Sequence, residues 1–350
     1  MKRQSLYFCG FVAILFCLNA QTEGAWTVQD GKLVDVEYVA TSSPQEHYRI
    51  GAEALNAGNW EEAAKQFRVV SYNFPSSSYG QDANYYLGIA YYKMQEYDFS
   101  NDSMDLYLKC QTNPKYFQEA IEYKLCIAEQ FRCGAKRHYY GTRYMPKWAS
   151  GKEMSLDIYD EVIASLPSHE MAAKAFFSKG RLLWEQKEYR EAIDSFQAVI
   201  KRFPKHELAP DSYLMINKIY LEQARREFQN PDLLAFSEIN LRKFEEHFPG
   251  EERLDEARKD VLCIKELYAK GLYDTAYFYE RINQPQAAVM YYQKAMFDYP
   301  ETTIGQRSKR RLCRLCPKAL ELPTKRKMEE SESEDIEFSG LLDLEEGIHS

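Results

Sequence analysis

The chain has 350 residues, of which 45% are hydrophobic, so it can bury a large core. Its formal net charge is −8, and the ten acidic and four basic residues of the tail 317–350 contribute −6 of it, which leaves −2 for residues 1–316. A nearly neutral folded part excludes a nucleic-acid-binding protein, because such proteins present a strongly basic face.

The N-terminus has the pattern of a secretory signal peptide. Lys2 and Arg3 precede an uncharged apolar stretch from Leu6 to Leu18, and a small residue, Ala20, follows it. The stretch is shorter than the ~20 residues that span a bilayer. We therefore expect residues 1–20 to be a signal peptide and the protein to be exported to the periplasm. An uncleaved anchor and lipidation of Cys17 stay open as alternatives, although the residue before Cys17 is a bulky Phe.

Three segments share a spacing that is typical of tetratricopeptide repeats. In each, a Gly or Ala is followed by an Ala, an aromatic residue and a Pro at the same distances, and such a unit forms a helix–turn–helix. The three sets are Gly51/Ala63/Phe67/Pro75, Gly180/Ala192/Phe196/Pro204 and Ala276/Ala288/Tyr292/Pro300. Weaker copies carry Ser155 and Ser237 in place of the Ala. The pattern predicts an all-α tetratricopeptide-repeat solenoid of about five to six helical hairpins over residues 43–316, without strands.

Residues 132–152, which we call the basic-aromatic loop, interrupt the repeats. They include six basic residues and no acidic one, with tyrosines and Trp148 between them. A long loop inside a repeat array is often functional. Its predicted contact residues are Arg137, Tyr140, Arg143 and Trp148, facing an acidic partner or lipid headgroups. A solvated loop with Trp148 packed back on the repeats is the competing interpretation.

Catalytic motifs are missing from the sequence. It has no GxSxG, no Gly-rich phosphate loop and no HExxH. We therefore expect no enzyme, no cofactor and no metal. Cys313 and Cys316 form a CxxC, which leaves a redox or enzyme-accessory protein as an alternative, but the strand–helix context of a thioredoxin-like site is not predicted there.

The chain is rich in tyrosine, with 27 residues that often occur as doublets. Adjacent helical residues point ~100° apart, so one ring of a doublet can pack while the other faces a groove. A groove-facing Tyr suits peptide recognition because it is rigid and amphipathic. Most Tyr in such repeats are core residues, which is the competing interpretation. The candidate residues of a client-binding groove are Tyr48, Tyr85, Tyr92 and Tyr123.

The tail 317–350 is poor in aromatic residues and rich in Ser and Glu, so we expect it to be a disordered acidic tail.

Together these features resemble the BamD family, the outer-membrane lipoproteins of the β-barrel assembly machinery. The resemblance rests on the export signal, the early start of the repeats, the Phe-Pro and Tyr-Pro closures and the long loop, and it is most specific over residues 276–302 and 48–78. It implies a non-enzymatic scaffold, peripheral to the outer membrane on its periplasmic side. The N-terminal repeats would receive unfolded outer-membrane proteins, and the C-terminal repeats would dock the barrel-forming assembly subunit.

Within the last repeat, the resemblance places partner docking at Tyr279, Tyr291 and Tyr299. The chain departs from the family at Tyr291, where relatives often carry a basic residue, and at the residue before Cys17. A Tol-associated periplasmic repeat protein for envelope integrity or cell division is the alternative of the same fold. Such proteins usually carry a coiled coil before their repeats, whereas the repeats begin almost at once here.

Overall fold

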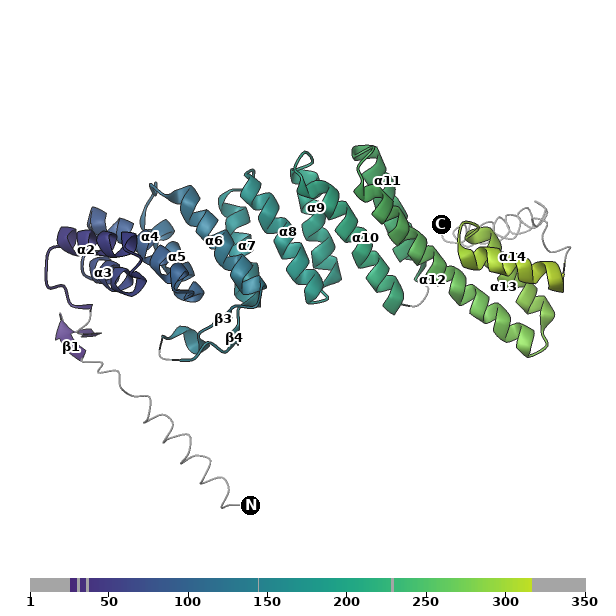
Figure 1. Cartoon of the computed structure of the whole chain (residues 1–350), viewed down its shortest axis with the longest axis horizontal. Coiled ribbons are helices and arrows are strands. Elements are labelled where there is room, and N and C mark those ends of the chain that lie inside the picture. Colours follow the sequence, from purple (N-terminus) through teal and green to yellow (C-terminus); the bar gives the residue numbers. More distant parts are fainter. Residues whose placement is uncertain (1–25, 30–31, 36–37, 144, 228–229, 317–350) are drawn as a thin grey trace, which may run out of the picture. The chain divides into compact units, whose positions relative to one another are not determined.

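A computed structural model describes residues 26–29, 32–35, 38–143, 145–227 and 230–316 (Figure 1). The expected signal peptide 1–20, with Cys17, and the expected acidic tail 317–350 lie outside the described residues. The chain divides into two compact units, unit 1 (Met1–Glu188) and unit 2 (Tyr189–Ser350).

The described part of the chain is built mainly from α-helices. Those of unit 1 are α2 (Pro44–Asn56), α3 (Trp60–Asn73), α4 (Ser78–Lys93), α5 (Tyr97–Cys110), α6 (Phe117–Arg132), α7 (Lys152–Ser165) and α8 (Glu170–Glu185). Those of unit 2 are α9 (Tyr189–Arg202), α10 (Leu208–Arg226), α11 (Pro231–His247), α12 (Arg253–Arg281), α13 (Pro285–Asp298) and α14 (Thr303–Leu315). In the described part of the chain, the helices from α2 to α14 are enough to form the expected five to six helical hairpins. The prediction of an all-α tetratricopeptide-repeat solenoid is confirmed.

Four helices end in one backbone conformation, directly before a proline. Their C-cap residues have φ between −131° and −135° and ψ between 50° and 63°: Phe74, Leu166, Phe248 and Tyr299. At Phe74 and Phe248 the cap N–H still donates to the carbonyl four residues back, at 3.0 Å and 2.9 Å. The following proline has no N–H to donate and would clash one turn back, so the helix stops there. This is the physical reason for the recurring closures.

The repeat positions form the core, as the spacing predicts. Six of them have no exposed surface: Ala63, Phe67, Ala192, Phe196, Ala288 and Tyr292. A Cβ on Gly51 would lie 3.1 Å from the Phe67 ring, so α2 and α3 approach closely because the position carries no side chain. Full burial of each aromatic ring stabilises the fold by ~1.5–3 kcal/mol.

The weaker repeats keep the close crossing with a serine. Ser155 and Ser237 are fully buried. The Ser155 hydroxyl donates to the Ala128 carbonyl at 2.8 Å, and the Ser237 hydroxyl donates to Asn217 Oδ1 at 3.3 Å. Each hydroxyl is thus satisfied inside the core, which removes the cost of burying it.

Two short hairpins depart from the expectation of no strands. Strand β1 (Trp26–Gln29) pairs antiparallel with β2 (Lys32–Asp35), and β3 (Lys136–Arg137) pairs with β4 (Ala149–Ser150). The residues between β1 and β2 are Asp30 and Gly31, a pair that favours tight hairpin turns. That local signal was available in the sequence. The β3–β4 pair closes the basic-aromatic loop.

Across the described helices, none combines the length and apolar character needed to cross a membrane.

Candidate partner-binding surfaces

The tyrosines predicted for client binding lie together in unit 1. Ring centroids of Tyr48 and Tyr86 are 5.8 Å apart, those of Tyr86 and Tyr85 5.2 Å, and those of Tyr85 and Tyr123 6.3 Å. Tyr92 adjoins Tyr123 at 5.5 Å. These rings come from α2, α4 and α6 and form one continuous group. We call Tyr48, Tyr85, Tyr86, Tyr92, Tyr116 and Tyr123 the tyrosine cluster.

The predicted tyrosines differ in how much ring surface they offer. Tyr48, Tyr92 and Tyr123 are half-buried. Tyr85 is only 7% exposed and stacks at 4.6 Å on Tyr116. The ring of Tyr85 is therefore a core residue that supports its neighbours and leaves little surface for a partner.

Two members of the cluster, Tyr86 and Tyr116, were not among the predicted residues. Both are half-buried, and the Tyr86 hydroxyl donates to the Tyr116 hydroxyl at 3.0 Å. The doublet Tyr85-Tyr86 was the signal for Tyr86. Tyr116 follows α5 in the sequence and N-caps α6, a loop position without helical periodicity to point to it.

Five of the six hydroxyls of the cluster are held in the neutral form, in which they donate and accept hydrogen bonds. Desolvation by burial raises the pKa of five of them: Tyr48, Tyr85, Tyr86, Tyr92 and Tyr123. Tyr116 differs, because the hydrogen bond from Tyr86 and the nearby Lys115 ammonium lower its pKa. The Lys115 Nζ lies 4.8 Å from the Tyr116 ring centroid. Rings with neutral hydroxyls can pack on apolar side chains and still bond a peptide backbone.

A second aromatic surface lies at the end of α12 and the start of α13 in unit 2. The rings of Tyr279 and Tyr291 stack with centroids 5.5 Å apart and an interplanar angle of 5°. Beside them, Phe278 is 58% exposed and Met290 57%. Tyr299 is not part of this surface, because its ring packs on the core that includes Leu221, Leu233 and Ile264, whereas Tyr279 and Tyr291 pack on the core that includes Ala276 and Tyr292. The structure thus brings together two of the three predicted docking residues.

The predicted contacts of the basic-aromatic loop are mostly exposed. Tyr140 is 80% and Trp148 76% exposed, Arg143 is exposed and Arg137 is half-buried. Trp148 therefore does not pack back on the repeats. Arg143 also borders a cavity of about 390 Å³ that Glu61, Glu62, Lys65 and Arg68 help to line. The walls of that cavity carry charges of both signs, so it does not select for one charge.

One cluster of possible metal ligands occurs in the described part of unit 1. Ligand atoms of Glu96, Asp98 and His138 lie within 4.8 Å of one another. His138 Nδ1 is 2.8 Å from Asp98 Oδ2, and the Lys147 ammonium is 2.9 Å from Glu96 Oε2. A cationic side chain therefore already faces these carboxylates, and the group serves as an anchor for the basic-aromatic loop.

The CxxC cysteines lie at the end of α14. Cys313 is exposed and Cys316 is half-buried, and both are free thiols, as are the other cysteines of the described residues.

Solved structures with similar folds come from other tetratricopeptide-repeat proteins. A MamA fragment from Desulfovibrio magneticus RS-1 is 16% identical with a TM-score of 0.35, and the alignment covers 63% of this chain and 98% of that one. YrrB, described as a TPR protein with an unusual peptide-binding site, is 15% identical with a TM-score of 0.35, covering 62% and 92%. A thermophilic TPR protein from Thermus thermophilus is 16% identical with a TM-score of 0.29, covering 63% and 100%. Among curated proteins, none matches the chain.

Two family matches fall on the described residues. Residues 174–206 match the tetratricopeptide repeat, in agreement with the repeat set that ends at Pro204. Residues 40–125 match the family YfiO, described as outer membrane lipoprotein, which confirms the predicted resemblance to the BamD family over this range. The last repeat, residues 276–302, lies outside that match. The chain is a tetratricopeptide-repeat protein whose first repeats match an outer-membrane lipoprotein family, and both matches support a protein-interaction scaffold.

Proposed function

We propose that the protein is a non-enzymatic periplasmic scaffold for the assembly of β-barrel proteins into the outer membrane. In this role unit 1 binds segments of unfolded barrel proteins, and unit 2 docks the barrel-forming assembly subunit. The observation that carries the proposal is the position of the tyrosine cluster in the sequence. The whole tyrosine cluster, from Tyr48 to Tyr123, falls within residues 40–125, which match the outer-membrane lipoprotein family.

The chemistry of the tyrosine cluster suits an extended client segment. Its rings are held by one another, as in the contact of Tyr48 with Tyr86, so little side-chain entropy is lost on binding. Strand ends of outer-membrane barrels are rich in aromatic residues at the membrane interfaces. Aromatic pairs add ~0.5–1.5 kcal/mol beyond the area that they bury. A client segment of this composition would gain from several such pairs at once.

The exposed surface of α12 and α13 supports a second binding role. Phe278 contacts Tyr279 of the stacked pair, with ring centroids 5.6 Å apart, and the exposed Met290 precedes Tyr291 in α13; exposed apolar side chains that gather on a surface mark interaction sites. Because the pair comes from two helices of unit 2, we assign this surface to a folded partner domain. The redox alternative rests on Cys313 and Cys316 and gains no support from any other residue of α14.

Affinity purification from envelope fractions tests the proposal. A tagged copy of the chain should recover a barrel-forming assembly subunit. Recovery of Tol-system components in its place would favour the envelope-integrity alternative and contradict the assembly role.

The client role has a sharper test in the tyrosine cluster. Tyr48→Ala combined with Tyr92→Ala should weaken binding of a peptide from a barrel strand by at least about tenfold, because two aromatic contacts are lost. Titration of the peptide against parent and variant measures this. Tyr72→Ala is the matched control, since Tyr72 is 52% exposed on α3 and lies outside the cluster.

A second variant distinguishes the loss of aromatic contacts from a loss of affinity through misfolding. Tyr48→Phe with Tyr92→Phe keeps both rings and removes only the hydroxyls, so it should bind with most of the parent affinity. If the alanine variant folds and binds the peptide as tightly as the parent, the cluster is not the client site.

A further inference from the structure

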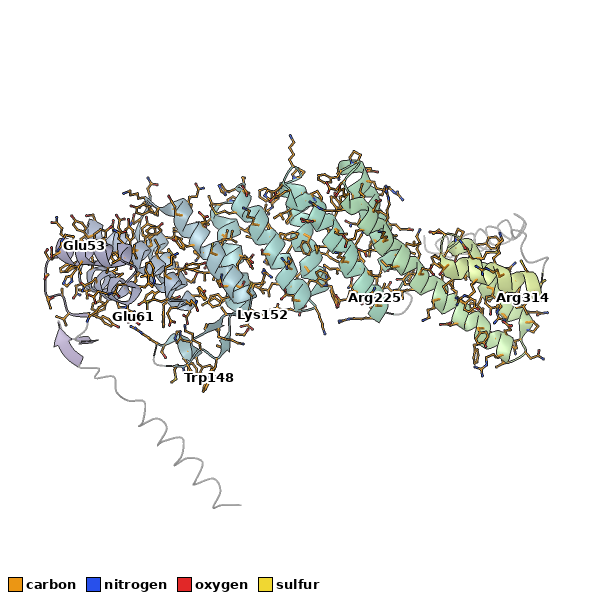
Figure 2. All side chains as sticks on the ribbon, in the orientation of Figure 1. Glu53, Glu61, Trp148, Lys152, Arg225 and Arg314 are labelled. Carbon is orange, nitrogen blue, oxygen red and sulfur yellow. The ribbon has the colours of Figure 1, made fainter. Side chains whose placement is uncertain are left out.

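The basic-aromatic loop carries the two most exposed large apolar side chains of the described residues. Tyr140 is 80% and Trp148 76% exposed, and the next value, that of Phe278, is 58%. Leaving a Trp and a Tyr in water forfeits the free energy of burying them, ~1.5–3 kcal/mol for each large side chain. The fold of unit 1 does not cover these rings, although the loop starts and ends on its helices (Figure 2). A binding partner that the described residues do not include is therefore expected to cover them.

The loop is held firmly at its base. Buried His138 bonds to Asp98 Oδ2 through both its backbone N–H and its ring Nδ1, each at 2.8 Å. Across the loop, the Lys147 ammonium donates to the Gln95 carbonyl at 3.1 Å. The β3–β4 pair joins the two arms. The arm with His138 is thus fixed to the first turn of α5, and the arm with Lys147 to the turn between α4 and α5.

The tip of the loop is also closed on itself. The Pro146 carbonyl accepts the N–H groups of Tyr139 and Trp148, at 3.1 Å and 3.0 Å. Tyr140 has φ 56°, a left-handed conformation that costs a non-glycine residue ~1–3 kcal/mol. Its ring lies against that of Tyr139, with centroids 4.4 Å apart, but it remains so exposed that burial does not compensate for this strain. The conformation of the loop therefore leaves the rings of Tyr140 and Trp148 exposed to solvent.

The charges of the loop divide into two sets. Arg132, Lys147 and Lys152 form ion pairs with glutamates of the neighbouring helices and turns. In the described residues, Lys136, Arg137 and Arg143 make no ion pair, and the loop contains no acidic residue. Lys136 and Arg143 are exposed and available to an anionic ligand, whereas Arg137 is half-buried and its Nε is a buried atom.

We infer that the basic-aromatic loop is a membrane-contact element, which inserts Tyr140 and Trp148 into the interface of a bilayer with anionic headgroups. Trp and Tyr are the residues that favour the membrane–water interface, and nearby Lys and Arg add attraction to anionic lipids. An acidic protein partner fits less well. Hot-spot aromatic residues in protein interfaces fill well-packed pockets, whereas both rings here are exposed side chains of a loop. The inference is independent of client binding and of partner docking.

Vesicle flotation tests this inference with the chain from Gln21 onward, which contains every described residue and no site for lipidation at Cys17. The protein should float with vesicles of phosphatidylglycerol and phosphatidylethanolamine and remain behind with vesicles of phosphatidylcholine. Tyr140→Ser with Trp148→Ser should abolish flotation. Lys136→Glu with Arg143→Glu should weaken it at least about tenfold, since each cation near an anionic surface contributes severalfold.

Matched controls sit outside the loop. Tyr72→Ser removes another exposed ring, and Lys201→Glu with Lys205→Glu reverses two exposed cations of unit 2. Both should float as the parent does. Lipids brominated in their acyl chains should quench the tryptophan fluorescence of the parent more than that of Trp148→Phe. This difference reports insertion of the ring itself.

Three results would contradict membrane contact by the loop. Flotation of the Tyr140/Trp148 variant at the level of the parent would overturn the inference. So would equal quenching of the parent and Trp148→Phe. Binding of the parent to an acidic peptide, with no flotation on either vesicle, would assign the loop to a protein partner instead.

Discussion

Tyr85 and Tyr86 are neighbours in the sequence and differ in what they offer a partner. Tyr85 is 7% exposed, whereas Tyr86 is half-buried and bonds to Tyr116. A helix turns ~100° per residue, so the two rings point in different directions. Both side chains are identical, and the sequence therefore does not tell which one faces the core. The selection of Tyr85 as a groove residue depended on that undetermined direction.

A buried hydrogen bond between Tyr159 and Glu129 joins α7 to α6. The buried Tyr159 hydroxyl donates to Glu129 Oε1 at 2.6 Å, and Arg132 donates to Oε2 at 2.8 Å. Burial opposes ionisation of Glu129, but hydrogen bonds from Ser178, Tyr159 and Arg132 outweigh it and hold its pKa below the ordinary 4.5. Glu129 therefore contributes stability that is present above about pH 4.5 and is lost as the pH falls through the lower folded-state pKa.

Tyr159→Phe should consequently destabilise the protein by ~1–2 kcal/mol at pH 7, because it removes a hydrogen bond to a charged group. The difference from the parent should shrink as the pH falls from about 4.5 through the lowered pKa of Glu129, where the carboxylate of the folded parent becomes protonated. Urea unfolding from about pH 3 to pH 7 measures both. A difference that is the same at every pH would show that the charge of Glu129 does not matter to this bond.

At the scale of elements, α12 contributes side chains to two separate hydrophobic cores of unit 2. Its first half contributes Ile264 and Tyr268 to a core with α10 and α11, and Ala276 near its end joins a core with α13 and α14. Tyr299, the C-cap of α13, packs on the first of these cores. It thus ties the last helices to the preceding ones, whereas Tyr291, equally half-buried, packs on the second core. Tyr291 and Tyr299 therefore support different cores.

Tyr299→Ala should therefore destabilise unit 2 by ~2–3 kcal/mol, because it leaves a cavity in a core that its half-buried ring helps to fill. Tyr291→Ala should also lower stability, because its ring packs on the second core, and should in addition weaken binding of the partner domain. Guanidinium unfolding and partner titration on both variants distinguish these effects. A loss of partner affinity in folded Tyr299→Ala as large as that in Tyr291→Ala would contradict the assignment of docking to Tyr291.

At the scale of the whole molecule, the proposed client and partner surfaces lie in different compact units. The tyrosine cluster belongs to unit 1, and the pair Tyr279–Tyr291 belongs to unit 2. Each surface rests on cores inside its own unit, so a change in one need not disturb the other.

Truncation before Leu272 is expected to separate the two activities. It removes the end of α12 together with α13 and α14. The core between α10, α11 and α12 stays, except for the ring of Tyr299, which is lost with α13. Client-peptide affinity should stay within about twofold of the parent, since sites that share no contact partners are nearly independent. Binding of the partner domain should be lost. If the truncated chain remains folded and loses both activities, the division between the units is wrong.

The sequence by itself determined the repeat architecture of this protein. The spacing of Ala63, Phe67 and Pro75 is a local and periodic property, so it predicts buried positions and helix ends without knowledge of distant contacts. A proline is tolerated in the first turn of a helix but cannot continue one, and the closures at Phe74 and Phe248 follow from that rule. The Asp30-Gly31 hairpin signal was equally local.

Only the tertiary structure decided which side chains meet across the chain. Asp98 and His138, which anchor the basic-aromatic loop, are 40 residues apart. Lys124 is 2% exposed and bonds to Asp105 and Glu161, respectively 19 and 37 residues away, although a lysine is expected at the surface. Such contacts depend on how helices stack, which fixes the burial of each residue. That stacking is a property of the folded chain as a whole, and no local pattern records it.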